Sequence, residues 1–202
     1  MSELTVLGEP TIPLPTLVTE VGPLAAALDA ATPAARFAWL RSLGRREVRA
    51  LWPLAEGRPT SADDLIRGDG VTIAEGRNTV PLFPNFQKRF VRMSDGRIAG
   101  YNHNGAIATF FGGPGHFVAV DSPDRPGESW VDYRSVHPEH HPEFPPPIPN
   151  ERGFWPNFIY GNQVDVMRRV SAHVLVGDAF RVKAGTWKRR NFWFVLLFAE
   201  AR

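Results

Sequence analysis

The feature that most constrains this fold is an uncharged run of eight residues, Phe-Trp-Phe-Val-Leu-Leu-Phe-Ala, at positions 192–199. Successive side chains of a β-strand point to opposite faces, so both faces of a strand in this run are apolar and must be shielded from water. In a closed antiparallel barrel, one face lines the lumen and the other needs a cover. We therefore predict a mainly β protein with an antiparallel β-barrel. A strongly curved sheet wrapped on helices is the alternative.

The aromatic residues separate a helical first part from a β-rich remainder. Only Phe37, Trp39 and Trp52 precede position 80, whereas twenty aromatic residues follow it, and aromatic side chains favour strands. Short helices are predicted at residues 24–30, 33–43 and 46–52, with a brief helical turn at 61–64. Because helices this short are not stable alone, we expect one compact domain in which residues 1–70, an arm and short helices, pack on a barrel formed by residues 71–202.

The remainder of the chain alternates short apolar runs with turn signals, as an antiparallel meander does. Ser-Asp-Gly at positions 94–96 is a tight hairpin signal between two such runs. About seven to nine strands are predicted from this spacing. The ten candidate runs lie at residues 86–93, 97–104, 106–111, 116–120, 128–135, 157–160, 164–170, 172–176, 179–184 and 192–199.

A long connection at residues 137–156 interrupts the strands. It contains seven prolines and three of the six histidines. Connections of this length inside a compact domain are uncommon and are usually lids, binding loops or arms. Proline stiffens the segment toward an extended shape, so we interpret it as a stiff lid over the barrel.

Composition excludes several classes of function. The chain has no cysteine, which excludes disulfides, thiolate metal sites and cysteine nucleophiles. It also has no Walker lysine, dinucleotide fingerprint or serine-hydrolase elbow, so no cofactor is expected. The first twenty residues lack Lys and Arg, and no apolar stretch is long enough to cross a bilayer. We therefore expect a cytoplasmic protein that does not bind a membrane.

Basic residues cluster near the end of the sequence, at Lys183, Lys188, Arg189 and Arg190. A nucleic-acid-binding face is one interpretation of such a cluster. Basic residues at a hairpin end are more often a solvated rim, and we expect no nucleic-acid partner.

Two segments carry a resemblance to a known group of proteins. Residues 47–52, Glu-Val-Arg-Ala-Leu-Trp, and residues 165–170, Asp-Val-Met-Arg-Arg-Val, with Gly177 and the final apolar run, are similar to an uncharacterised bacterial family. That family has an N-terminal Gly-x-Trp-x-Gly element and a C-terminal β domain. Ala50 and Leu54 occupy the positions of the two glycines in this chain. The resemblance implies a small calycin-like barrel and no particular substrate.

The histidines of the long segment are candidate metal ligands. Imidazole and carboxylate groups bind zinc and related ions, and His137, His140 and His141 lie beside two glutamates. However, an extended, proline-stiffened backbone spreads adjacent side chains apart, whereas a metal site converges them. We therefore predict no metal site and keep these three histidines as weak candidates.

Strand alternation selects polar and aromatic residues for an interior site. Histidine suits acid or base chemistry near neutral pH, and a carboxylate can orient it, so the candidate catalytic residues are His103, Asp132 and His173. Large aromatic side chains beside an apolar lumen are typical of ligand pockets. The predicted ligand-binding residues are Tyr101, His103, Trp130, Asp132, Arg134, Phe144, Trp155 and Tyr160.

Three functions are compatible with these features. The first is binding of a small, largely apolar molecule in a barrel cavity gated by the proline-rich segment. The second is a cofactor-free isomerase, cyclase or lyase that uses a histidine and a carboxylate in the same cavity. The third is an interaction or oligomerisation module in which the segment at 137–156 docks on another subunit, with a homo-oligomer as the product.

Overall fold

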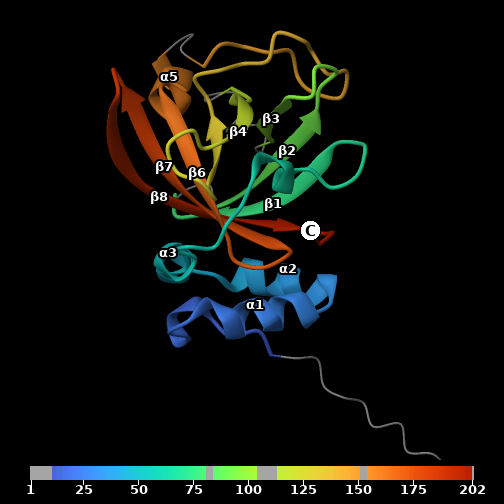
Figure 1. Ribbon diagram of the computed structural model, residues 1–202, viewed down its shortest axis with the longest axis vertical. Coiled ribbons are helices and arrows are strands. Elements are labelled where there is room, and N and C mark those ends of the chain that lie inside the picture. The colour runs from blue at the N-terminus through green and yellow to red at the C-terminus, as the bar shows by residue number, and fades with distance from the viewer. Residues whose placement is uncertain (1–10, 81–83, 104–112, 151–153, 202) are drawn as a thin grey trace, which may run out of the picture.

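The computed structural model describes residues 11–80, 84–103, 113–150 and 154–201, with the backbone alone described for 154–156. It confirms the closed antiparallel barrel (Figure 1). Each strand pairs with its neighbours in chain order, and β1 closes the barrel against β8. The strands are β1 (Thr72–Asn78), β2 (Asn85–Arg92), β3 (Ile98–His103), β4 (His116–Asp121), β5 (Ser129–Asp132), β6 (Gln163–Arg169), β7 (Val174–Lys183) and β8 (Thr186–Phe198).

The four helices predicted in the first part are present as α1 (Val21–Ala30), α2 (Pro33–Ser42), α3 (Arg45–Leu54) and the short η2 (Ala62–Leu65). A further turn of helix, η1 (Pro15–Leu17), lies in the segment predicted to be an irregular arm. The helices α1, α2 and α3 cover one side of the barrel (Figure 1). At the start of α2 the Thr32 hydroxyl accepts a hydrogen bond from the Ala35 amide at 3.2 Å, as the N-cap prediction requires. In α3, Val48, Leu51 and Trp52 share the buried face.

Four predicted strands differ from the structure. Residues 157–160 belong to a helix, α5 (Phe154–Tyr160), in which Pro156 lies in the first turn, where proline is tolerated. The two strands predicted at 172–176 and 179–184 form the single strand β7. The last strand begins at Thr186 rather than at position 192, because pairing with β7 stabilises its polar first half. The strand predicted at 106–111 lies outside the described residues.

The lumen is packed with apolar side chains. Phe90, Phe117 and Phe198 point inward, and each is at most 1% exposed. Glycines on the inner face make room for such rings: a Cβ atom at Gly100 would collide with the ring of Phe117, and one at Gly177 with that of Phe194. The barrel is therefore a filled core rather than an open channel.

On the outer face of the barrel, the helices shield the apolar strands from water. The run at 192–199 needs this cover because its side chains are apolar on both faces. Leu28 of α1, Leu40 of α2 and Leu51 of α3 belong to one buried cluster with Val195 and Leu197 of β8. All five side chains are at most 5% exposed. Among the described residues no helix is long and apolar enough to cross a membrane.

The two ends of the lumen are closed by different elements. At one end, Leu65 and Ile66 of the η2 region belong to the lumen cluster, and the Ala62 amide donates to Asp121 Oδ1 at 2.6 Å. At the other end, Tyr160 of α5 belongs to the same cluster.

Replacing Gly177 with alanine is expected to destabilise the protein by about 1–3 kcal/mol, since the new methyl group must displace the ring of Phe194 from a filled lumen. Gly22 of α1 is the matched control, because nothing lies within 4 Å of its Cβ position, and Gly22→Ala should leave the stability unchanged or slightly raised. Urea denaturation measures both variants. Equal stability of the Gly177→Ala variant and the unmodified protein would contradict the packing described here.

Candidate functional site: a buried ionic network in the barrel

A buried lysine lies inside the lumen, close to the end that α5 covers. Lys88 of β2 is 2% exposed, and its ammonium group donates to Asn102 Oδ1 at 3.0 Å and to Asp165 Oδ2 at 3.1 Å. It also hydrogen-bonds the hydroxyl of Tyr133. Lys88 and Asn102 are direct cross-strand neighbours on β2 and β3, whereas Asp165 reaches them from β6 on the opposite wall.

The network continues from Asp165 toward the rim of the barrel. Gln163 Nε2 donates to Asp165 Oδ1 at 2.8 Å, and Arg190 of β8 donates to Gln163 Oε1 at 2.5 Å. Arg190 also binds the backbone carbonyl oxygens of Phe158 and Ile159 in α5. The guanidinium group therefore joins the buried network to the helix that covers it.

Aromatic rings surround the ammonium group of Lys88. Its Nζ lies 4.9 Å from the ring centroid of Tyr133, 5.0 Å from that of Phe194 and 5.1 Å from that of Phe117. Ring faces attract cations, so these side chains offset part of the hydration that the ammonium group loses.

The site perturbs the protonation of its members. Burial lowers the pKa of Lys88, and the nearby Asp165 carboxylate opposes that effect. Burial, with the negative charge of Asp165, raises the pKa of Tyr133 well above its ordinary value. Burial also lowers the pKa of Arg190. Strongly perturbed groups inside a fold are typical of functional sites.

The network carries an excess of positive charge. Lys88 and Arg190 are cationic, and Asp165 is its one carboxylate among the described residues. A buried ion pair contributes little net stability, and apolar side chains of similar size often serve a core better. Stability alone therefore gives no reason for this arrangement. The donors of the network suit a hydrogen-bond acceptor or an anion that approaches from the end covered by α5.

Tyr160 covers the network at that end. Its ring stacks on Tyr133, with the centroids 5.2 Å apart and the planes inclined by 15°. Gly115, before β4, has a positive φ of 56°, and a Cβ atom there would collide with Tyr160. This close approach brings α5 down onto the lumen. A ligand that reaches Tyr133 must therefore displace Tyr160.

Most of the polar residues predicted for the interior lie on the outer face of the barrel. Tyr101 alternates with the inward-pointing Asn102, and Asp132 lies between the inward-pointing Val131 and Tyr133. Alternation correctly grouped residues that share a face, but it cannot tell which face is inside. The residues placed outside are Tyr101, His103, Trp130, Asp132 and Arg134. Their predicted role in ligand binding stays a prediction.

The candidate catalytic residues are not brought together. Asp132 binds Arg134 through both carboxylate oxygens, at 2.8 and 2.7 Å. His103 lies 3.4 Å from the hydroxyl of Tyr101, while His173 Nδ1 lies 3.2 Å from the Phe198 carbonyl oxygen at the other end of the barrel. Within the described ranges, no hydrogen bond or ion pair joins a histidine to Asp132. Among the described residues, the three candidate catalytic residues therefore form no histidine–carboxylate pair with one another.

The proline-rich segment runs along the outer wall before it reaches the lumen end. His137 Nε2 lies 3.1 Å from Asp95 Oδ2 in the β2–β3 turn, and Phe144 packs on Tyr101 with ring centroids 4.8 Å apart. Asn150 then donates to the backbone carbonyl oxygens of His116 and Tyr133. These contacts attach the described part of the segment to the outer wall, up to the end of the lumen that α5 covers.

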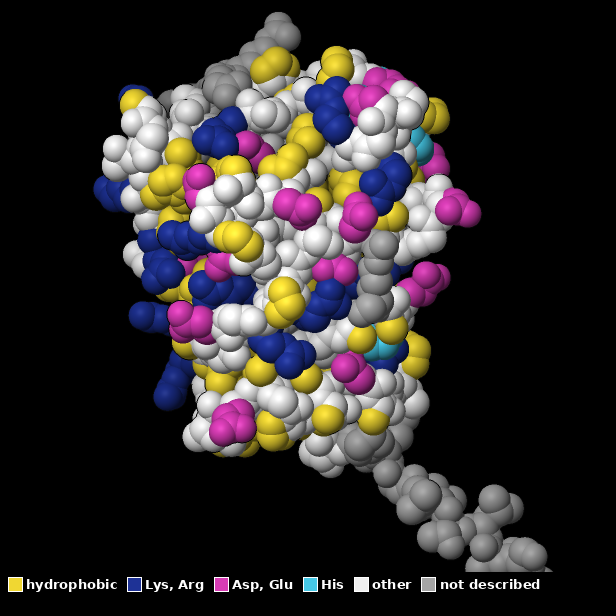
Figure 2. Space-filling model, in the orientation of Figure 1, with side chains coloured by type: hydrophobic (Ala, Val, Ile, Leu, Met, Phe, Trp, Pro, Cys, Tyr) yellow, Lys and Arg dark blue, Asp and Glu magenta, His cyan; other side chains and the backbone are white. Residues whose placement is uncertain are grey.

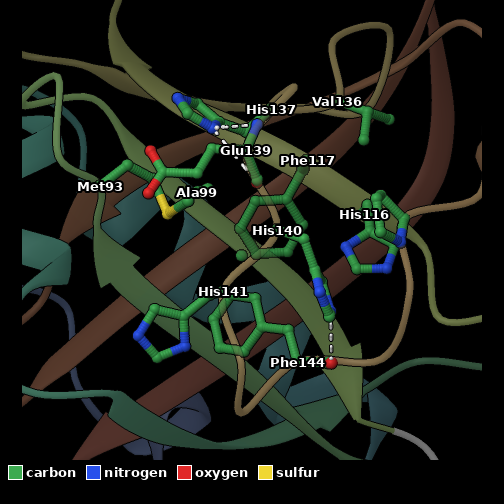
Figure 3. A pocket seen from close by; sticks show the side chains of 12 residues that line it. Met93, Ala99, His116, Phe117, Val136, His137, Glu139, His140, His141 and Phe144 are labelled. Carbon is green, nitrogen blue, oxygen red and sulfur yellow. Dashed lines mark hydrogen bonds between the residues drawn. The ribbon is translucent and has the colours of Figure 1, made fainter.

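The segment and the wall enclose a small hollow of about 20 Å³, room for about one water molecule. Figure 3 shows its histidines at separate positions around the hollow. His140 Nε2 lies 2.9 Å from the Phe144 carbonyl oxygen, and His141 Nδ1 accepts from the Glu143 amide. The part of the chain that is described holds no group of three residues suited to a metal ion.

Two further candidates belong to the α5 region. Tyr160 lies at the network, as described above. Trp155 is in α5, but its side chain lies outside the described residues. Phe144, by contrast, is 7% exposed and pins the segment to the wall.

Sequence reasoning missed most of the network. One usable signal was the order Phe86, Lys88 and Phe90 on alternate positions of a predicted strand, which places a lysine on an apolar face. The residues that were not selected for an interior site are Lys88, Asn102, Tyr133, Gln163 and Arg190, while Asp165 entered through the resemblance. Comparison of the chain with family models, with curated proteins and with solved structures finds no match. The resemblance carried by residues 47–52 and 165–170 therefore stays a prediction.

Proposed function

We propose that the barrel binds a small, largely apolar molecule that carries an anionic group, at the lumen end covered by α5. The observation that carries this proposal is an excess of positive charge at this end of the lumen: the buried Lys88 and the half-buried Arg190 face one carboxylate, Asp165, among the described residues of the network. A buried unbalanced cation is costly. An anionic ligand would supply the missing negative charge and take charge-assisted hydrogen bonds from both cations.

The apolar character of the ligand follows from the rings around the network. Phe117, Phe194 and Tyr133 surround Lys88, and Tyr160 occupies the face of Tyr133. Ligand pockets commonly combine such apolar walls with a few polar groups that fix orientation. We place the apolar body of the ligand where Tyr160 now stacks. Movement of α5, rather than of the proline-rich segment itself, would open the site.

A pair of fluorescent probes tests the proposal. Anilinonaphthalene sulfonate and N-phenyl-1-naphthylamine share an apolar body, and the first alone carries an anionic group. We expect the sulfonate probe to bind about tenfold to a hundredfold more tightly, the range that one charge-assisted hydrogen bond provides. Arg190→Gln should weaken the sulfonate probe by about tenfold and leave the neutral probe unchanged.

Arg45→Gln is the matched control, because Arg45 lies exposed on α3, far from the lumen end, and it should change neither affinity. Thermal denaturation verifies that both variants fold. Equal affinity for the two probes would remove the anionic group from the proposal. A protein that binds neither probe, and carries no small molecule in native mass spectrometry, would refute it.

A further inference from the structure

The tip of the β7–β8 hairpin presents one basic face. The hairpin extends past Gln163, the first residue of β6, which pairs with Arg181. Arg181 and Lys188 are direct cross-strand partners. Because alternate residues of a strand share a face, Lys183 and Arg190 lie on that same face. We call these four residues, Arg181, Lys183, Lys188 and Arg190, the basic tip.

No acidic side chain balances the basic tip locally. Positions 179–199 contain no Asp or Glu, and none of the four residues forms an ion pair within the described part of the chain. Arg181 and Arg190 instead donate to the backbone carbonyl oxygen of Phe158 in α5. Carbonyl groups orient the guanidinium groups without neutralising them, so the tip keeps its positive charge.

Exposed aromatic rings accompany these charges. Phe158 of α5 is 55% exposed and Phe192 of β8 is 38% exposed, and Arg190 lies over the ring of Phe192 at 5.0 Å. In Figure 1, α5 and the hairpin tip lie side by side at the upper left, on the side away from α1 and α2. Figure 2 shows Lys and Arg side chains along the left side of the molecule, most of them below the level of the hairpin tip.

Contrary to the expectation from the sequence that the protein does not bind a membrane, we propose that the basic tip, with Phe158 and Phe192, docks on the surface of an anionic lipid bilayer. Clustered Lys and Arg side chains are attracted to anionic headgroups, and exposed rings enter the boundary between headgroups and acyl chains. A protruding tip fits a flat surface. Single-stranded nucleic acid is instead bound in grooves that follow its backbone. Such docking goes beyond the proposed function. It would orient the α5 end of the lumen toward the bilayer, where apolar molecules dissolve.

Sedimentation with vesicles tests this docking in the full-length protein. We expect binding to phosphatidylcholine vesicles that contain about one third phosphatidylserine, and little binding to phosphatidylcholine alone. Lys183→Gln combined with Lys188→Gln should weaken the anionic-vesicle partition coefficient about thirtyfold, as two interfacial lysines predict. Both side chains are exposed, so the fold should be unaffected. Phe158→Ser should also weaken binding, at constant charge.

The matched control is Arg45→Gln combined with Arg46→Gln, which removes the same charge from exposed positions of α3 and should change the partition coefficient less than twofold. An equal loss in this control would overturn the proposal by showing that net charge alone acts. Equal partition into neutral and anionic vesicles would also overturn it. The proposal would also be overturned if the protein bound an oligothymidylate but no vesicles, and if the tip variant lost that binding. The tip variant should still bind the sulfonate probe, so failure here leaves the lumen proposal intact.

Discussion

Asp165→Leu should destabilise the protein by about 3–5 kcal/mol, the largest effect expected of a single substitution in this barrel. The change leaves the Lys88 ammonium group, which is 2% exposed, without its carboxylate in the lumen. A buried charge without a partner is costly because its hydration is not replaced. Urea denaturation at pH 7 measures the loss.

The double variant Lys88→Met, Asp165→Leu separates the cost of the unpaired charge from any loss of packing. Removing both charges together should restore most of the stability or exceed that of the unmodified protein, since well-packed apolar replacements of buried ion pairs are often neutral or stabilising. The control is Asp63→Leu, which breaks an exposed pair with Arg92 and should cost less than about 1 kcal/mol. If the double variant were as unstable as Asp165→Leu, the ion pair would be essential to the packing of the lumen.

Asp178→Asn should stabilise the protein by about 3 kcal/mol at pH 8 and have no effect near pH 3. Asp178 of β7 is 0% exposed, and burial raises its pKa from 3.8 to about 6, against the influence of Arg189. Arg189 Nε lies 2.7 Å from Oδ2, but neither carboxylate oxygen has a well-directed hydrogen bond among the described residues. The folded protein therefore holds the Asp178 proton more tightly than the unfolded chain does.

The sign of the pH dependence follows from that difference. Below pH 3.8 both states are protonated at this residue, and its ionisation carries no penalty. As the pH rises from 3.8 to about 6, the unfolded chain releases the proton first, so stability falls by about 1.36 kcal/mol for each pH unit. Asparagine cannot ionise, so the variant lacks this fall. Unfolding curves between pH 3 and 8 measure it, with the exposed Asp124→Asn as control. Parallel stability curves for the Asp178→Asn variant and the unmodified protein would contradict the prediction.

The architecture was predictable because it follows from patterns of side chains that are close together in the sequence. The apolar run at 192–199 requires cover on both faces, and both the lumen and the helices α1–α3 supply it. The hairpin at Ser94–Gly96 and the N-cap at Thr32 are equally local. The helix α5 was not predictable in this way, since its apolar residues fit a strand as well as a helix.

The site was harder to predict because it depends on a choice that alternation leaves open. Tyr101 and Asn102 are neighbours in one strand, yet Asn102 reaches Lys88 in the lumen and Tyr101 contacts Phe144 outside. Aromatic content suggested that Tyr101 faced inward. Tyr101 instead faces outward and is still buried, because Phe144 of the proline-rich segment covers it on the outer wall. Which face is inside depends on a contact distant in the sequence.

The closure of the barrel by β1 and β8 also determines how the chain can fold. β1 finds one of its two partners only when the last strand is available, and α1–α3 pack on β8 as well. The contacts that β1 and the helices α1–α3 make with β8 can therefore form only after the last part of the chain is available. Such long-range pairing slows folding and prolongs the exposure of apolar strands. Ribosome-bound chains that lack β8 should accordingly depend on chaperones far more than the complete barrel does.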